Sequence, residues 1–379
     1  MKNRSIDYMK AFVIVLVVIQ HAVLAYNVGF VFDDSYLVGG VLPVSNLTNP
    51  VHDTAQWSGF NLFVGMNDQF FMSLMFLISG FFVYKSLKKY GTKSFVGRRA
   101  KRLMLPVLLG IPTVIVLAYY PAALQSGFVN GTSPIPITEF FRGVASVGFM
   151  SGPLWFLTML FNFNLIVALV YRFYSKRKKR PSWLDKITLK SPFTLYCILI
   201  MLSLLLSASL NLVVHPIFWF PLGFASFQFT RLLHYFVYFI IGILIGKNDK
   251  LDEIFSEKSR ISQLWYIFLL IGILSYIITD TMPNGYILKH TLCSAPISFA
   301  VIGFFAKYVH KPNKVIDNFS GNAFNIYIFH IAFSSWIQYF LLYTNMPAVL
   351  KGIVAASLTL ILSWIFSDVF SKLKLKVLR

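Results

Sequence analysis

The sequence is short of charged residues, of acidic ones above all, and of cysteine. Only 13% of its 379 residues are charged, with 14 acidic against 34 basic side chains, while 57% are hydrophobic and 17% aromatic. This composition, with a mean hydropathy of +0.68, excludes an ordinary soluble globular protein. The chain is therefore predicted to be an integral membrane protein.

The scarcity of cysteine excludes a disulfide framework. Cys197 and Cys293 both lie within apolar runs and lack metal-ligand spacing, so buried packing is expected of both and no metal site is predicted. We find no internal repeat, no low-complexity tract and no stretch that reads as a soluble catalytic domain. Any chemistry is therefore expected within or between membrane helices.

Long apolar runs recur along the whole chain. The first, charge-free from Ala11 to Phe32, is long enough to span a bilayer and has no clear cleavage site after it, so we expect it to be retained as a helix and not removed as a signal peptide. We end two overlong runs near Pro121 and Pro216. The predicted spans are 8–30, 69–87, 103–122, 150–173, 192–213, 230–247, 262–280, 288–307, 321–343 and 348–369. This pattern predicts an all-α polytopic membrane protein with about ten transmembrane helices in one domain, 1–370, and a short basic tail, 371–379.

The basic residues predict the orientation. If the N-terminus is cytoplasmic, only four of the 34 Lys and Arg residues fall outside, namely Arg142, Arg231, Lys289 and Lys351. This bias follows the positive-inside rule, which supports cytoplasmic N- and C-termini and an even number of spans. It also explains the net charge of +20 without nucleic acid as a partner.

Two loops stand out by length. The basic loop from Lys176 to Lys190 is interpreted as a topology determinant near anionic lipid headgroups. The external connection from Val31 to Asp68 is long and polar, and is a candidate lid over a bound acceptor.

The first span carries an unusual polar stripe. Lys10 and His21 are eleven residues apart, which places them on one face of a helix and roughly 16 Å apart along its axis. Asp7 lies one turn before Lys10 and can neutralise it at the cytoplasmic interface. The stripe predicts a polar track from the cytoplasm to a buried imidazole, and ionisable groups inside a membrane indicate function.

Several segments, taken with this stripe, form an ordered set of motifs. They are "MFLISGFF" (Met75 to Phe82), "FVGRRAKRLMLP" (Phe95 to Pro106), "GPLWFLTMLF" (Gly152 to Phe161), "VYFIIGILIG" (Val237 to Gly246) and "NIYIFHI" (Asn325 to Ile331). In this order, and with the Lys10 to His21 spacing, the chain resembles the acyltransferase 3 family over nearly its whole length. Leu87 to Gly91 and the long first external loop are most similar to the branch of glucans biosynthesis protein C, which is associated with succinyl transfer.

The resemblance implies a fold and an activity. It implies a multi-pass protein of the bacterial inner membrane that moves an acetyl or succinyl group from cytoplasmic acyl-coenzyme A to a hydroxyl of an extracytoplasmic or lipid-linked glycan. The rival interpretation is a transporter or flippase for a glycan or small acid that uses the same polar track. Transporters often show inverted repeats and paired broken helices, and the sequence shows neither.

Candidate catalytic residues follow from these motifs. A neutral imidazole at His21 suits a general base for hydroxyl attack, and His21 is equally suited to carry the acyl group covalently. The alternative for His21 is a hydrogen bond between helices. Lys10, with Asp7, is expected to hold donor phosphates or to set the potential of the track, unless it is an ordinary snorkelling lysine. No carboxylate partner for His21 can be named from the sequence.

Candidate binding residues lie on other helices. Arg99 and Arg102 share a helix face at the cytoplasmic side and are expected to clamp the phosphates of coenzyme A, with the positive-inside bias alone as the alternative. A further set is assigned to substrate binding, with ion pairing, helix packing or interfacial anchoring as the alternatives. These residues are Arg231, His234, Tyr327, His330 and Trp155. Asp68 is one expected ion-pair partner of Arg231. His290, His310, His52 and His215 are expected to be solvated.

Overall fold

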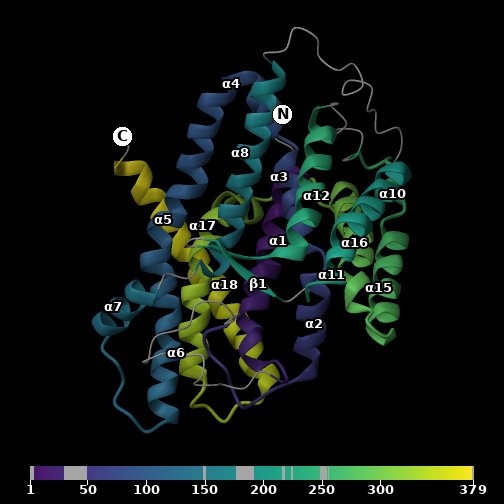
Figure 1. Ribbon diagram of the computed structural model, residues 1–379. Helices are drawn as coiled ribbons and strands as arrows, with labels where there is room; N and C mark the ends of the chain where they lie inside the picture. The colour runs from purple at the N-terminus through teal and green to yellow at the C-terminus, as the bar shows by residue number, and fades with distance from the viewer. Residues whose placement is uncertain are drawn as a thin grey trace.

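The computed structural model describes residues 4–29, 49–147, 151–175, 192–215, 218–222, 225–247, 254 and 256–377 (Figure 1). The predicted basic loop 176–190, the first part of the predicted lid, 31–48, and Pro216 lie outside these residues. The α-helices are α1 (Arg4–Val23), α2 (Ser58–Asp68), α3 (Phe71–Gly80), α4 (Val83–Arg99), α5 (Leu105–Gly110), α6 (Val116–Val129), α7 (Ile137–Val147), α8 (Trp155–Ser175), α10 (Pro192–Ser203), α11 (Ser209–Asn211), α12 (Phe229–Lys247), α14 (Arg260–Gln263), α15 (Trp265–Thr281), α16 (Tyr286–Tyr308), α17 (Lys314–Leu341) and α18 (Ala348–Val377).

Short stretches of other geometry connect some of these helices. Leu24–Tyr26 and Gly152–Leu154 are 3-10 turns, and Ala100–Met104, Ile111–Ile115 and Leu204–Ala208 are π-helical. Strands β1 (Trp219–Leu222) and β2 (Ala225–Gln228) form an antiparallel hairpin. Apart from this hairpin the regular structure described is helical, which confirms the predicted all-α polytopic membrane protein.

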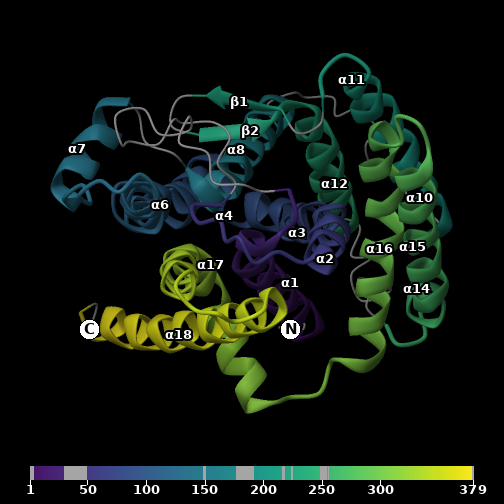
Figure 2. The ribbon, with the colours of Figure 1, turned by 90° about the horizontal axis from the view of Figure 1, so that it is seen from below.

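Eight helical segments in the described part of the chain are long and apolar enough to cross a membrane, and α15 is apolar but shorter. The exact number of spans stays a prediction. The start of α1 and the end of α18 lie toward the same end of the bundle (Figure 1). Seen along the bundle, α1, α2 and α3 are central, α10, α15 and α16 lie on one side, and α17 and α18 on another (Figure 2).

The predicted second span, 69–87, was wrong. The apolar helical segment runs over Ser58–Gly80, so α2 occupies the last part of what was predicted to be an external loop. Polar residues near the end of α2 suggested a loop, but their side-chain amide nitrogens donate hydrogen bonds inside the protein. Asn67 Nδ2 donates to the side chain of Gln20 and to the carbonyl of Leu16, and Gln69 donates to the carbonyl of Gly65. A span tolerates polar residues that are satisfied internally.

The predicted helix end near Pro121 was also wrong, since α6 continues to Val129. A proline within a helix leaves the carbonyl four residues earlier without its backbone donor, here that of Leu117. The indole Nε1 of Trp336 on α17 donates to this carbonyl over 3.0 Å. A side chain from a neighbouring helix thus replaces the lost bond, so the helix continues through the proline.

Helices α3 and α12 pack with their backbones in close contact. A Cβ atom on Gly242 would fall on the carbonyl of Leu77, and one on Gly80 would fall on the carbonyl of Phe239. Glycine at both positions therefore allows the two helices to approach this closely. This contact fixes α12 against the centre of the bundle.

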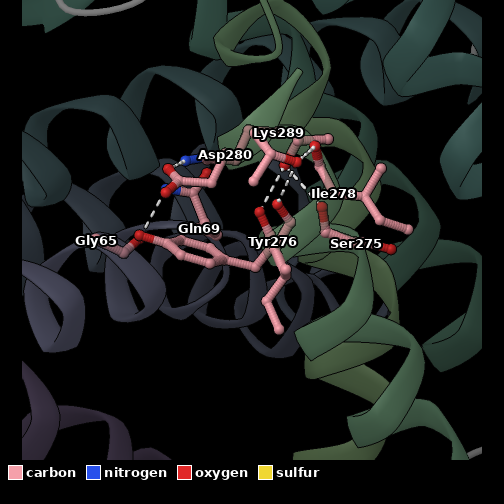
Figure 3. A network of polar contacts seen from close by, with 10 residues as sticks. Gly65, Gln69, Ser275, Tyr276, Ile278, Asp280 and Lys289 are labelled. Carbon is pink, nitrogen blue, oxygen red and sulfur yellow. Dashed lines mark hydrogen bonds and ion pairs between the residues drawn. The ribbon is translucent and has the colours of Figure 1, made fainter.

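The ends of α15 and α16 are joined by an ion pair between Asp280 and Lys289 (Figure 3). Lys289 Nζ also lies 4.4 Å from the ring centroid of Tyr276. Tyr276 in turn packs against α2, where a Cβ on Gly65 would meet its phenol oxygen. These contacts attach the α15 and α16 pair to the central helices.

Candidate active site

Two histidines from distant parts of the chain meet inside the bundle. His21 lies near the end of α1 and His330 in the middle of α17, with ring centroids 5.2 Å apart and ring planes at 51°. The side chain of His330 is fully buried, whereas His21 is half-buried. The helix-1 histidine, for which the sequence named no partner, therefore faces a second imidazole.

A backbone bond fixes the tautomer of His330. Its Nδ1 lies 2.7 Å from the carbonyl oxygen of Tyr327, one turn earlier on α17. Because a carbonyl only accepts, Nδ1 carries the proton of the neutral ring and Nε2 keeps its lone pair. Among the described residues, neither His330 Nε2 nor His21 Nδ1 has a hydrogen-bond partner, although both atoms are buried. The pair thus offers a basic ring nitrogen that is buried.

Tyr327 ties this pair to α8. Its hydroxyl donates to the carbonyl of Pro153, in the turn that precedes α8. The ring of Tyr327 also meets that of Phe156, with centroids 6.0 Å apart. The start of α8, which carries the predicted Trp155, therefore lies beside the histidine-bearing part of α17.

Asp7 and Lys10, where the polar stripe begins, lie near the start of α1, whereas His21 lies near its end. Lys10 Nζ lies 3.7 Å from Asp7 Oδ1 and 5.1 Å from the ring centroid of Phe82. Both charged side chains are about one-third exposed. The structure therefore brings Asp7 and Lys10 together at the end of α1 that leads inward to His21.

Arg99 and Arg102 approach the same end of α1. Arg99 ends α4 and lies over the ring of Phe95, while Arg102 lies in the following π-helical stretch, over the ring of Phe324 on α17. The charges of both arginines act on Lys10. We call Lys10, Arg99 and Arg102 the cationic cluster.

The position of Arg102 has a local cause. Pro106 has no N–H with which to bond the carbonyl of Arg102, and its ring displaces that carbonyl. The helix accordingly widens over Ala100–Met104, just before this proline. Such π-helical stretches occur often at functional sites.

Arg231 and His234 lie in a second polar cluster. Arg231 Nη1 is 2.7 Å from Asp68 Oδ2, which is the ion pair expected as an alternative to ligand binding. His234 Nε2 lies between the hydroxyls of Ser73 and Ser294, at 3.0 and 3.2 Å. The structure thus places these two residues of α12 against polar groups of α2, α3 and α16 rather than beside His21.

His290 belongs to this second cluster, and its predicted solvation was wrong. Its side chain is 3% exposed, and its ring centroid lies 4.5 Å from that of His234. The sequence placed it at the end of a span, but α16 begins at Tyr286, so His290 already faces the packed neighbours of that helix.

Aromatic side chains connect the second polar cluster, which contains Arg231 and His234, to the histidine pair. The ring of Trp155 lies 6.1 Å from that of Tyr235, which stacks on Phe76 at 5.1 Å. Phe76 meets Phe156 at 4.9 Å, and Phe156 meets Tyr327. Trp155, half-buried at the start of α8, therefore lies between the second polar cluster and the histidine pair.

Comparison with known families now bears on this geometry. The acyltransferase 3 family model, described as an acyltransferase domain, matches residues 3–368. The chain belongs to the acyltransferase 3 family. No curated protein and no solved structure shows significant similarity to it. Family membership and the apolar helices together make the protein a multi-pass membrane acyltransferase.

Sequence reasoning missed two side chains that hold the described end of the predicted lid at the end of α1 opposite the cationic cluster. Residues 49–57, here called the outer strap, cross the end of α1, and Gln338 of α17 and Lys351 of α18 hold them there. One signal for Gln338 was available. It lies eight residues after His330 with Ser334 between them, so the three polar residues form a stripe along one side of an apolar helix.

Proposed function

We propose that this protein transfers an acyl group from acyl-coenzyme A on the cytoplasmic side to a hydroxyl of an extracytoplasmic or lipid-linked glycan. The observation that carries the proposal is the pairing of His21 with His330 at the inner end of a stripe that starts in the cationic cluster. The donor is acetyl- or succinyl-coenzyme A, and the membrane is the cytoplasmic membrane of a bacterium.

The cationic cluster supports a phosphate-bearing donor. Lys10, Arg99 and Arg102 come from α1, α4 and the π-helical stretch, and their charges act on one another. Guanidinium groups bind phosphate in a bidentate manner, and a lysine adds a point charge. A coenzyme A held there by its phosphates would direct its thioester along the stripe toward His21, roughly 16 Å deeper.

The histidine pair supports the chemical step. An imidazole removes the proton of the acceptor hydroxyl as the oxygen attacks the thioester carbonyl. The new carbon–oxygen bond forms, the carbon–sulfur bond breaks, and the departing thiolate of coenzyme A takes the proton that the imidazole received. Atoms and charge then balance without a further reactant. His330, whose tautomer is set by the carbonyl of Tyr327, supports the step as the neighbour that orients the His21 ring, with the two ring centroids 5.2 Å apart.

Trp155 and Tyr327 support an acceptor position beside the pair. Trp155 offers a half-buried indole at the start of α8, and Tyr327 joins α8 to α17. An aromatic ring of this kind suits the apolar face of a sugar.

The proposal is tested with radiolabelled acetyl- and succinyl-coenzyme A added to inverted membrane vesicles, which expose the cytoplasmic face. Wild-type protein is compared with His21→Ala at equal amounts, and His215→Ala is the matched control, because His215 is an exposed histidine stacked on Tyr286. We expect label in glycan from wild type and control, and none from His21→Ala.

The sidedness of the reaction provides a second criterion. Right-side-out vesicles should give no labelled glycan, because coenzyme A does not cross the membrane. Transfer from neither donor, or transfer that does not depend on His21, would favour the transporter interpretation instead. Label found on His21 itself when acceptor is absent would replace the general-base route by a covalent acyl-histidine.

A further inference from the structure

The side chain of Gln338 joins α17 to the end of α1. Its Nε2 donates to the carbonyl oxygens of His21, at 2.8 Å, and Ala22, at 2.9 Å. The side chain is fully buried. Both hydrogens of one carboxamide are therefore used on two successive carbonyls, and the first of these belongs to the proposed catalytic histidine.

These carbonyls lie where a helix needs external partners. The last carbonyls of an α-helix have no donor within the helix, and α1 ends at Val23. Two carbonyls further along are bonded by the outer strap, since Asp53 N donates to Ala25 O and Trp57 N donates to Tyr26 O, both over 2.9 Å. Gln338 and the outer strap together thus bond the carbonyls of His21, Ala22, Ala25 and Tyr26.

Gln338 also contacts the outer strap directly. Its Oε1 accepts from Asn49 Nδ2 at 3.5 Å. The strap is held from two other helices as well. Gln125 of α6 bonds both backbone groups of His52, and Lys351 of α18 pairs with Asp53. One carboxamide therefore connects the strap to the turn of α1 that carries His21.

We propose that Gln338 is a positioning residue of the acyl transfer. It caps the end of α1 from a neighbouring helix and so holds the imidazole of His21 against His330. This inference rests on the proposed function of His21. Without the cap, the last turn of α1 frays as helix ends do, and the 5.2 Å ring contact is no longer fixed. A small misplacement of a catalytic group is sufficient to slow an enzyme strongly.

The carboxamide is the group that this position requires. Leucine has a similar size but donates no hydrogen bond, and a glutamate carboxylate would place acceptor oxygens against two carbonyl oxygens. Gln338→Leu therefore removes the cap while it keeps the packing. Ser335→Ala is the matched control, because Ser335 is equally buried on α17 and its hydroxyl donates to carbonyls of its own helix.

Two measurements on the full-length protein in detergent or nanodiscs test the proposal. The first is amide hydrogen exchange of residues 21–27, followed by mass spectrometry. The second is the rate of acyl transfer, resolved into kcat and the KM for acyl-coenzyme A. We expect faster exchange and a kcat lowered by about 10- to 100-fold in Gln338→Leu, with an unchanged KM because the cationic cluster lies at the other end of α1. Ser335→Ala should match wild type in both.

The outcomes separate this proposal from the proposed function. Unchanged exchange in Gln338→Leu, or an equal fall in kcat for Ser335→Ala, would overturn the positioning role. A wild-type protein that transfers no acyl group would instead overturn the proposed function. The exchange of residues 21–27 would still decide in that case whether Gln338 caps α1.

Discussion

The ammonium of Lys351 lies 2.7 Å from the carboxylate of Asp53, and the two side chains are only 3% and 2% exposed. The second oxygen of Asp53 accepts from the backbone N–H of Ala55 at 2.8 Å. A buried ion pair of this kind is tolerated only when both charges have good partners. The pair anchors the outer strap to α18, and through the strap it contacts the end of α1.

Removing one charge of this pair should destabilise the protein strongly. In Lys351→Met the carboxylate of Asp53 stays buried without its cation, which typically costs about 3 to 5 kcal/mol. The midpoint of thermal unfolding in detergent is the measurement, and we expect a clear fall for this variant. Because the strap covers the end of α1, acyl transfer should fall as well.

The double variant Lys351→Met with Asp53→Leu is the control for the charge effect. It removes both charges and should recover much of the lost stability, since apolar pairs often replace buried ion pairs at little cost. If the double variant were as unstable as Lys351→Met, packing rather than the unpaired charge would be the cause. If Lys351→Met unfolded like wild type, the pair would have no anchoring role.

The sequence predicted the helices of this protein far better than its contacts. Apolar runs and basic flanks mark helices because the bilayer constrains each span separately. The ends were harder to place. Trp336 allows α6 to pass Pro121, and Gln20 satisfies Asn67 in α2, and in both cases the compensating group is distant in sequence.

The sequence likewise predicted some features of the candidate site and not others. The stripe from Asp7 to His21 lies within one helix, so its spacing could be recognised in the sequence. The contact of His21 with His330 spans 309 positions of the chain, and no local pattern shows which helices pack together. Gln338 was missed for a related reason, because its bonds go to backbone carbonyls, which carry no residue-specific signal.

Replacing His330 should slow transfer without loss of the fold. In His330→Asn the amide nitrogen takes the position of Nδ1 and keeps a donor for the carbonyl of Tyr327, but the basic Nε2 is lost. We expect kcat to fall by about 10²- to 10⁴-fold, the usual contribution of an acid–base group. The labelled transfer assay measures the rate, and thermal unfolding verifies the fold. A rate within a factor of two of wild type would limit His330 to helix packing.

Replacing the arginines of the cationic cluster should weaken donor binding selectively. Arg102→Ala and Arg99→Ala each remove a charge-assisted contact to phosphate, so the KM for acyl-coenzyme A should rise by about 10- to 100-fold. The KM for an acyl-pantetheine, which lacks the nucleotide phosphates, should change little. Arg98→Ala is the matched control, because Arg98 stacks on Tyr90 at 4.0 Å. An equal effect in this control would indicate a general loss of positive charge.

Acid should loosen the outer strap through His52. The predicted solvation of this residue was wrong, because Gln125 bonds both of its backbone groups, and burial of the imidazole lowers its pKa from 6.5 to about 4. Between these two values the unfolded chain binds a proton that the folded protein does not, so stability falls as the pH drops from about 6.5 to about 4.

The non-titrating variant His52→Gln removes this proton uptake. The unfolding midpoint of wild type should therefore fall relative to that of His52→Gln as the pH falls from 7 to 4.5. Above pH 7 the difference between the two midpoints should stay constant. The protection of residues 49–57 against hydrogen exchange in wild type, relative to the intrinsic rate at each pH, should fall over the same interval, because the strap opens when His52 becomes charged. A midpoint difference that is independent of pH would show that His52 keeps its ordinary proton affinity and that burial in the strap does not act on it.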